Sequence, residues 1–270
     1  MNKIPATVEI MTRNNAATLP RALESIKDFA EIIIIDGGST DETRTIAESY
    51  GARVIDQDPQ FLDKGGRIRD FAAIRNQGFA ASAQSWFFFL DSDEYASPEL
   101  ITAIRRTIGE GAKDGYWVRR KYVVNGRVID SAYSYPNRSM RLVAKESAEG
   151  FIKQVHERIK LKEGSAIGEI IEPIYVPLDA DAKAGRDKIN RYIEVQLAQE
   201  GDISWRALLG ITYDTLRACA IYALRECKVL CFGRGNRLPL AFALETERYH
   251  MRVLRRFWGE KLRRTFHAYA

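Results

Sequence analysis

Residues 86–94 read Trp86-Phe87-Phe88-Phe89-Leu90-Asp91-Ser92-Asp93-Glu94, an apolar run that ends in three carboxylates. Consecutive apolar residues, most of them aromatic, are typical of a strand that is buried on both faces of a sheet. Charges are costly to bury, so the acids are expected at the strand's carboxyl end, where open α/β sheets bind ligands. Asp91 and Asp93 could there hold one hard cation. The alternative is a solvated acidic turn that only closes the strand.

The first hundred residues alternate between strand and helix patterns. The predicted strands cover Thr7–Met11, Glu31–Asp36 and Arg53–Ile55, and the predicted helices Ala17–Phe29, Asp41–Tyr50 and Ile68–Ser82. Strands separated by helices of this length predict an α/β fold with a mainly parallel central sheet. Further strands are expected at Tyr116–Val124 and Ser139–Val143, and the chain is mostly helical from Asp187 onward.

Composition narrows the class of protein. The chain has 270 residues and a net charge of +5, but residues 205–270 alone hold 13 Lys/Arg against 5 Asp/Glu, a balance of +8. The three cysteines lie outside any CxxC pair, which favours free thiols in a reducing compartment over disulfides or a metal site. No apolar run reaches the length of a membrane span, and the N-terminus leads directly into a strand, so we expect neither a span nor a signal peptide.

Polar segments follow the first two predicted strands. Thr12-Arg13-Asn14-Asn15 comes after the first strand and could hold a base or a ribose. Asp36-Gly37-Gly38-Ser39-Thr40-Asp41 comes after the second, where glycines permit close backbone approach and the next helix N-terminus favours anions. Arg75 lies in the helix before the acidic stretch and could reach a diphosphate. The alternatives are a well-capped turn for Asp36–Asp41 and an ordinary surface arginine for Arg75.

Four segments in this order and spacing resemble the family 2 glycosyltransferases. They are Thr12-Arg13-Asn14, Ile35–Asp41, Ala73-Ile74-Arg75-Asn76 and Leu90–Glu94, and Val155-His156-Glu157-Arg158 extends the similarity more weakly, toward the bacterial enzymes of lipopolysaccharide core and surface glycans. The resemblance implies a GT-A fold and an inverting transfer from a nucleoside diphosphate sugar, assisted by Mg²⁺ or Mn²⁺. It also implies a nucleotide-sugar half at residues 1–110, an acceptor half at 111–186 and a helical, basic extension at 187–270.

The resemblance assigns donor-site roles residue by residue. Asp93 would be the main metal ligand of a DXD motif, and Asp91 would share the metal or hold the ribose. Asp36 would accept hydrogen bonds from base or ribose, while Arg13 and Arg75 would bind base or phosphate. The remaining donor contacts expected from these motifs are Thr12, Asn14, Gly38, Ser39, Asp41 and Ser92.

Inversion needs a base that deprotonates the acceptor hydroxyl opposite the leaving group. Glu157 occupies the His-Glu position of the branch that the chain resembles, and His156 beside it is expected to position the acceptor. The alternative for Glu157 is an ion pair with Arg158 or Lys160 on an exposed strand. Glu94 is a rival base, but its position ties it to the donor site.

One segment departs from the family pattern. Many members have a histidine on a later strand as an additional metal or phosphate contact, whereas this chain has Tyr175-Val176-Pro177-Leu178-Asp179-Ala180-Asp181 there. Asp179 or Asp181 could substitute.

The C-terminal segment suggests a contact with a membrane. On a helix, Met251, Leu254, Trp258 and Leu262 form an apolar stripe flanked by arginines, a pattern typical of helices that lie on an anionic membrane surface. We therefore expect a cytoplasmic protein that associates peripherally with the inner face of the membrane. The alternative is a stripe that packs on the catalytic domain. Nucleic acid is not an expected partner, because no recognised binding module accompanies the charge.

Two other functions stay open at this point. A sugar-phosphate nucleotidyltransferase also uses an α/β sheet, acidic residues and Mg²⁺, but its arginine-containing glycine-rich loop would follow the first strand, whereas Gly65-Gly66-Arg67 comes much later. A non-catalytic relative would bind nucleotide sugars or glycans without turnover. Release of nucleoside diphosphate rather than pyrophosphate distinguishes the transferase from the first alternative.

Overall fold

The computed structural model describes residues 2–110, 113–154, 156–178 and 203–267. The chain divides into two compact units, Met1–Lys121 with Pro136–Pro177, and Tyr122–Tyr135 with Leu178–Ala270. The functional division into residues 1–110, 111–186 and 187–270 stays a prediction.

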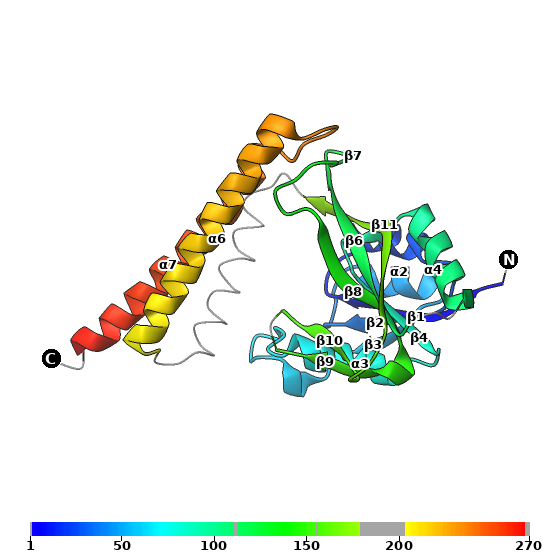
Figure 1. Ribbon diagram of the computed structural model, residues 1–270. Coiled ribbons are helices and arrows are strands. Elements are labelled where there is room, and N and C mark those ends of the chain that lie inside the picture. The colour runs from blue at the N-terminus through cyan, green and yellow to red at the C-terminus, as the bar shows by residue number, and fades with distance from the viewer. Residues whose placement is uncertain (1, 111–112, 155, 179–202, 268–270) are drawn as a thin grey trace. The chain divides into compact units, whose positions relative to one another are not determined.

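The first unit is built on one large sheet. Its strands run in the order β3-β2-β1-β4-β8-β6-β11-β5 (Figure 1). Their bounds are β1 Ile4–Thr12, β2 Phe29–Asp36, β3 Arg53–Asp56, β4 Trp86–Asp91, β5 Tyr95–Ala96, β6 Gly115–Val124, β8 Asn137–Ala144 and β11 Ile167–Leu178. The first four neighbours pair in parallel, and the strands beyond β4 pair antiparallel where their register is defined. This confirms the predicted α/β class and its parallel sheet.

Alternating residues of the central strands are buried on opposite faces of this sheet. Ile34 and Phe88 pack with helices α1 (Leu19–Ser25), α2 (Thr43–Ser49) and α4 (Pro98–Glu110). Ile35 and Phe89 lie on the other face, which α3 (Phe71–Ala81) covers. The Trp86–Leu90 run is therefore the doubly buried strand that its apolar sequence predicts.

The predicted helix over Ala17–Phe29 is too long. α1 ends at Ser25, and Phe29 already begins β2, two residues before the predicted strand start. The Phe29 ring stacks on Phe88 with ring centroids 5.8 Å apart. This contact between distant residues places Phe29 in the sheet, and the helical spacing of apolar residues could not reveal it.

A smaller sheet lies beside α3. Strands β9 (Ala148–Ile152) and β10 (Arg158–Leu161) pair antiparallel. Asn76 of α3 holds β9, since its side-chain amide donates to the Phe151 carbonyl at 2.9 Å and accepts from the Phe151 amide at 2.7 Å. Two 3₁₀ turns, Pro59–Phe61 and Lys145–Ser147, complete the unit.

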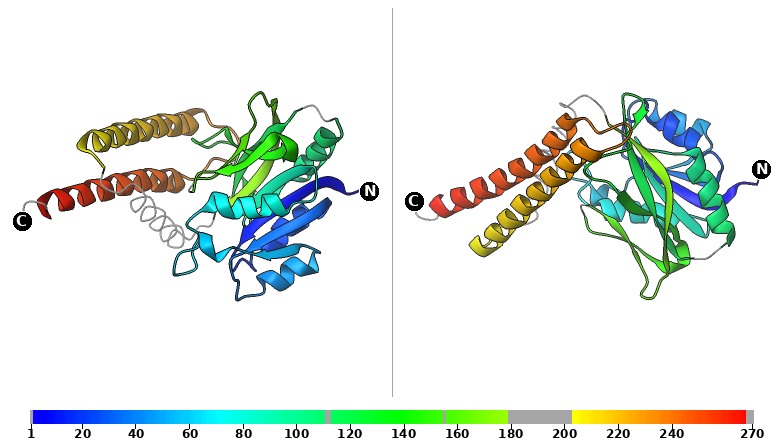
Figure 2. Two further views of the ribbon diagram at one scale, coloured as in Figure 1. Left: turned by 90° about the horizontal axis from the view of Figure 1, so that it is seen from below. Right: turned by 45° about the horizontal axis from the view of Figure 1, so that its top comes forward.

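The second unit contains two long helices, α6 (Trp205–Phe232) and α7 (Leu240–His267), which lie side by side (Figure 2). The short strand β7 (Arg127–Val128) pairs with the end of β6, and Tyr133 and Leu238 belong to the core of this unit. None of the helices within the described ranges combines the length and the apolarity needed to cross a membrane.

Candidate active site

The ends of β1, β2 and β4 bring the predicted donor residues to one edge of the sheet. In the strand register Thr12 lies opposite Asp36, and Met11 lies opposite Asp91. The chain turns directly after β4, where the Glu94 amide donates to the Asp91 carbonyl at 3.0 Å. Asp93 is exposed on this turn, and the Asp91 side chain is 42% exposed. Both carboxylates are therefore accessible at the edge where the sequence placed them.

Arg75 links this turn to the region that contains Glu157. Its guanidinium is 1% exposed and lies 2.6 Å from Asp91 Oδ1, 3.3 Å from Glu9 Oε1 and 3.5 Å from Glu157 Oε1. It also lies over the Phe89 ring, 4.9 Å from the centroid. The surface-arginine alternative is therefore wrong, because Arg75 is buried beneath the acidic turn.

Two further arginines hold the carboxylates of the turn. Arg141, on β8, lies 3.4 Å from Asp91 and 3.0 Å from Glu94, and Arg120, on β6, also pairs with Glu94. The partial burial of Asp91 acts to raise its pKa, but the charges of Arg141, Arg75 and Arg120 together hold that pKa below its usual value. Burial raises the pKa of Glu94 above its usual value. Glu94 is only 1% exposed and lies between two arginines, which removes it as a base for an acceptor hydroxyl.

Glu9 is a member of this cluster that sequence analysis missed. It lies in the middle of β1 and is fully buried, with Oε1 beside Arg75; among the residues that the structure describes, Oε2 has no hydrogen-bond partner. Burial raises its pKa to about 7, although Arg75 opposes this. Arg141 was missed too. The available signal was the same for both residues, a charge within an otherwise apolar strand pattern.

Glu157 directly precedes β10, and its side chain is 20% exposed. Its contact is with Arg75, while Lys160 pairs with Glu149 at 2.5 Å, so the alternative pairing with Lys160 is wrong. His156 is exposed and has a left-handed backbone, with φ of 57°. The structure therefore brings Glu157 to the acidic turn through a shared arginine.

The loops after β1 and β2 are bonded to each other. The Asn14 amide donates to Ser39 Oγ at 2.9 Å, and the Thr40 amide donates to Asn14 Oδ1 at 2.8 Å. Asp41 accepts from the Ala16 amide at 3.1 Å, and its hydrogen bonds, above all the one from the Thr43 hydroxyl, hold its pKa below the usual value. These bonds fix the two loops as one polar rim beside Thr12.

Asp36 is already occupied by its own loop. Its carboxylate accepts from the amides of Gly38 and Ser39 at 3.2 and 3.0 Å, and Arg44 lies 3.1 Å away. Gly38 has φ of 75°, a conformation that favours glycine at this turn. Asp36 is fully buried, so the structure gives it the role of shaping the loop, and its direct contact with a nucleotide stays a prediction.

Arg13 extends across the rim to another loop. Its guanidinium donates to the Gly66 carbonyl, in the segment before α3. Arg13 is exposed, in contrast to the buried Arg75. The two arginines predicted to bind phosphate or base therefore differ: Arg13 is open to solvent, and Arg75 is buried against Asp91.

The carboxylates of the turn could supply only some of the ligands that a divalent cation needs. Asp91, Ser92 and Asp93 present oxygens at the edge of the sheet, and Mg²⁺ is commonly held by one or two carboxylates together with substrate phosphates. Within the described ranges no group of three His, Cys, Asp or Glu residues could hold a metal ion. Asp179 and Asp181, the proposed substitutes for a family histidine, lie outside the described residues.

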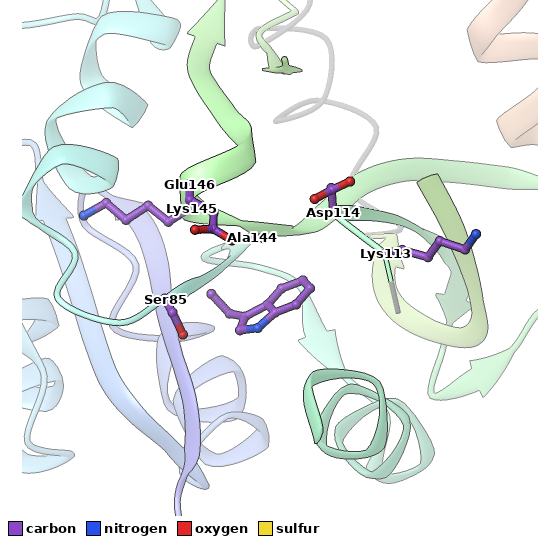
Figure 3. A pocket seen from close by; sticks show the side chains of 7 residues that line it. Ser85, Lys113, Asp114, Ala144, Lys145 and Glu146 are labelled. Carbon is purple, nitrogen blue, oxygen red and sulfur yellow. The ribbon is translucent and has the colours of Figure 1, made fainter. Parts of the chain in front are cut away.

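A separate hollow lies at the start of β4, at the end of the strand opposite to the acidic turn (Figure 3). It has a volume of about 660 Å³ and is lined by Ser85, Trp86, Lys113, Asp114, Ala144, Lys145 and Glu146. Trp86 begins β4, whereas the acidic turn follows its end. This hollow therefore does not belong to the candidate active site.

The chain is similar in sequence to a known protein family and to curated proteins. The model of the family described as Glycosyl transferase family 2 matches residues 7–156. An uncharacterized glycosyltransferase of Rickettsia felis is 35% identical over 120 residues, covering 43% of this chain and 38% of that protein. A lipopolysaccharide core biosynthesis glycosyltransferase of Rhizobium meliloti, LpsC, is 28% identical over 174 residues, covering 58% of this chain and 57% of that protein. The chain thus spans less than two thirds of the length of these curated relatives.

Solved structures are also similar. Staphylococcus aureus TarS 1–349 in complex with UDP-GlcNAc has a TM-score of 0.48 at 17% identity, covering 95% of this chain and 80% of that one. Glucosyl-3-phosphoglycerate synthase from Mycobacterium tuberculosis, in complex with Mn²⁺, UDP and glucosyl-3-phosphoglycerate, has a TM-score of 0.33 at 26% identity, covering 44% of each chain.

The family match includes the polar loops after β1 and β2, the acidic turn and His156. The α/β unit has the GT-A fold, with helices on both faces of its sheet. Because the match covers more than half of its residues, the chain belongs to glycosyl transferase family 2.

Proposed function

We propose that this protein is an inverting glycosyltransferase that moves a sugar from a nucleoside diphosphate sugar to a hydroxyl of a glycan or lipid-linked acceptor. One observation carries the proposal: buried Arg75 lies 2.6 Å from Asp91 and 3.5 Å from Glu157. A carboxylate suited to the donor side and a carboxylate suited to the acceptor side are thus held by one guanidinium. Such an arrangement fits a reaction in which a leaving group and an incoming hydroxyl meet at one carbon.

The donor would bind along the rim formed by the loops after β1 and β2. Thr12, Asn14, Ser39 and Asp41 would line the place for base and ribose, and exposed Arg13 would bind base or phosphate. Because these loops are hydrogen-bonded to each other, the rim is formed before the donor arrives. A preformed site loses less entropy on binding than a flexible one.

Asp91 and Asp93, with Ser92 between them, are the residues that would hold Mg²⁺ or Mn²⁺ at the diphosphate. Such a cation would neutralise the charge that develops on the leaving diphosphate. Arg75 and Arg141 already balance the charge of Asp91, and Asp93 is exposed on the turn. Arg75 would therefore act on the donor by orienting Asp91 rather than by direct contact.

Glu157 is the proposed base. The acceptor oxygen attacks the anomeric carbon, Glu157 takes the proton of the hydroxyl, and the bond between that carbon and the diphosphate oxygen breaks. The electron pair leaves with the diphosphate, and the configuration at carbon inverts. The contact with Arg75 keeps Glu157 facing the acidic turn, and exposed His156 beside it would position the acceptor.

We place this reaction in the synthesis of cell-envelope polysaccharide or lipopolysaccharide, in the cytoplasm at the inner face of the membrane. A relative named for lipopolysaccharide core biosynthesis supports the pathway class, and three free cysteines support a reducing compartment.

The test is a thermal-shift screen of nucleoside diphosphate sugars with and without Mn²⁺, followed by product analysis. The true donor should raise the melting temperature, because it binds the folded state only. Incubation of that donor with an acceptor glycan should release nucleoside diphosphate. Release of pyrophosphate would instead identify a nucleotidyltransferase, and binding without turnover would identify a non-catalytic relative; either result contradicts the proposal.

A further inference from the structure

Helix α6 presents a continuous apolar stripe to solvent. Its members and their exposed fractions are Trp205 43%, Leu209 58%, Tyr213 68%, Leu216 51% and Leu224 71%. Since an α-helix turns by about 100° per residue, these five residues fall within one arc of about 100°. Single exposed apolar residues are ordinary in proteins, but a continuous stripe of this length marks an interaction surface.

Helices α6 and α7 form an antiparallel pair. Near one end Trp258 Nε1 donates to Thr212 Oγ1 at 2.9 Å, and farther along the ring centroids of Tyr222 and His250 lie 5.7 Å apart. From the first contact to the second, the residue number rises on α6 and falls on α7, so the two helices run antiparallel.

The exposed apolar residues of α7 lie on the same face of this pair. Leu208 and Leu254 are buried. Each lies one helical turn from a residue that contacts the other helix, Thr212 on α6 and Trp258 on α7, so both fall on the side where the helices meet. Leu244, Met251 and Leu262 are 40%, 48% and 40% exposed. On each helix, turning about the axis in the direction of increasing residue number leads from the residues at the interface to the exposed apolar residues. Because the two helices run antiparallel, both sets of exposed apolar residues then lie on the same face of the pair. We call this surface, made by the α6 stripe with Leu244, Met251 and Leu262, the apolar face.

The structure corrects the stripe predicted on α7. Of its four residues, Leu254 is 7% exposed and Trp258 bonds to Thr212, so both pack against α6. Met251 and Leu262 are exposed. The larger part of the apolar surface therefore belongs to α6, not to α7.

Basic residues border the apolar face on both sides. They are Arg206, Arg217 and Lys228 along the outer edge of the α6 stripe, and Arg248 and Arg255 along the outer edge on α7, all exposed. Of the carboxylates, Glu226 is buried between the helices, Glu247 is half-buried, and the helical spacing turns Asp214, Glu245 and Glu260 away from the face. The surface is thus apolar at its centre and cationic at its borders.

We propose that the apolar face docks on an anionic lipid bilayer, with α6 and α7 lying parallel to the surface. Apolar side chains would enter the boundary between headgroups and acyl chains while the bordering cations meet lipid phosphates. A second copy of the chain fits less well, because two such faces brought together would oppose their basic borders. The inference rests on the proposed function only in that a lipid-linked acceptor would lie in the same membrane.

The experiment measures flotation of the full chain with vesicles of phosphatidylcholine, with and without one quarter phosphatidylglycerol. Binding should require phosphatidylglycerol and weaken with salt, and each of Arg206→Gln and Arg255→Gln should weaken it about fivefold. Leu209→Glu should weaken binding at least about tenfold, since it removes a leucine that would be buried in lipid when the protein is bound. The matched control is Phe232→Glu, at a residue of α6 that is 78% exposed and turned away from the face; it should bind as wild type does.

Three results would overturn the inference: no binding to anionic vesicles, equal binding by wild type and Leu209→Glu, or equal loss in Leu209→Glu and Phe232→Glu. So would a solution dimer, seen by light scattering, that Leu209→Glu converts to monomer. Circular dichroism melts confirm that the variants are folded. Neither donor nor acceptor is present in this assay, so its failure leaves the donor screen and the proposed transfer unaffected.

Discussion

Arg75 and Glu9 are charged residues that the fold keeps almost entirely away from water. Such burial is costly, and apolar residues of similar size often stabilise a core at least as well. Their position gives a reason to retain them, since Arg75 contacts Asp91 and Glu157, the two carboxylates with proposed roles in transfer. We infer that these buried charges serve to orient the site.

At the residue scale we predict a pH dependence of stability that originates in Glu9. Burial raises its pKa from 4.5 to about 7, so between these values the folded state holds a proton that the unfolded state releases. Because of Glu9, the free energy of unfolding should therefore decrease as pH rises from about 4.5 to about 7, so that the protein becomes less stable. Above about pH 7 the contribution of Glu9 should stay constant. Glu9→Gln cannot titrate and should lack this loss.

The measurement is the free energy of unfolding in urea for wild type and Glu9→Gln, compared at several pH values. The difference should grow in favour of Glu9→Gln over this range. A constant difference across it would show that Glu9 titrates in the folded protein as it does in water.

At the scale of elements, α3 and β1 approach closely where Gly78 faces Glu9. A Cβ at Gly78 would lie 2.7 Å from Glu9 Cγ and 3.2 Å from Ile35 Cγ1. Gly78→Ala should therefore destabilise the protein by about 1–3 kcal/mol through overpacking, which outweighs the gain of up to about 1 kcal/mol in helix propensity.

Urea unfolding tests this contact. The control is Gly109→Ala in α4, where a Cβ would meet nothing within 4 Å and the substitution should be neutral or stabilising. Adding Glu9→Ala to Gly78→Ala should remove most of the overpacking. If Gly78→Ala is as stable as wild type, the close packing of α3 on β1 is contradicted.

Much of the sheet could be predicted because its strands are uniformly apolar. Ile32–Ile35 and Phe87–Leu90 have no polar residue to place at a surface, and polar segments follow where the strands end. The end of α1 could not be predicted, since Phe29 enters β2 through its contact with Phe88. Long-range packing of this kind leaves no local pattern in the sequence.

The candidate site divides in the same way. Asp91, Asp93, Glu157 and Arg75 could all be selected from motifs. That buried Arg75 joins Asp91 to Glu157 could not be predicted, because these three residues are distant in sequence. Glu9, Arg141 and Arg120 acquire their contacts only when β1, β8 and β6 assemble. The sequence predicts the apolar stripe on α7. In the structure, part of that stripe packs against α6, and most of the exposed apolar residues belong to α6.

At the scale of the whole molecule, the chain contains an α/β unit of glycosyl transferase family 2 and a pair of long helices with an apolar face. In the first unit, we propose that Asp93 serves the donor and that Glu157 serves the acceptor. These roles separate binding from turnover, so two variants should fail in different ways.

The most direct measurement compares wild type, Asp93→Ala and Glu157→Gln with the donor found by thermal shift, recording both donor-induced stabilisation and the rate of transfer. Glu157→Gln is nearly isosteric but cannot take a proton; it should keep the stabilisation and lose about 10²–10⁴-fold in rate. Asp93→Ala should lose the Mn²⁺-dependent part of the stabilisation together with transfer. Near-normal turnover by Asp93→Ala, or loss of donor binding by Glu157→Gln with its transfer rate unchanged, would contradict the account.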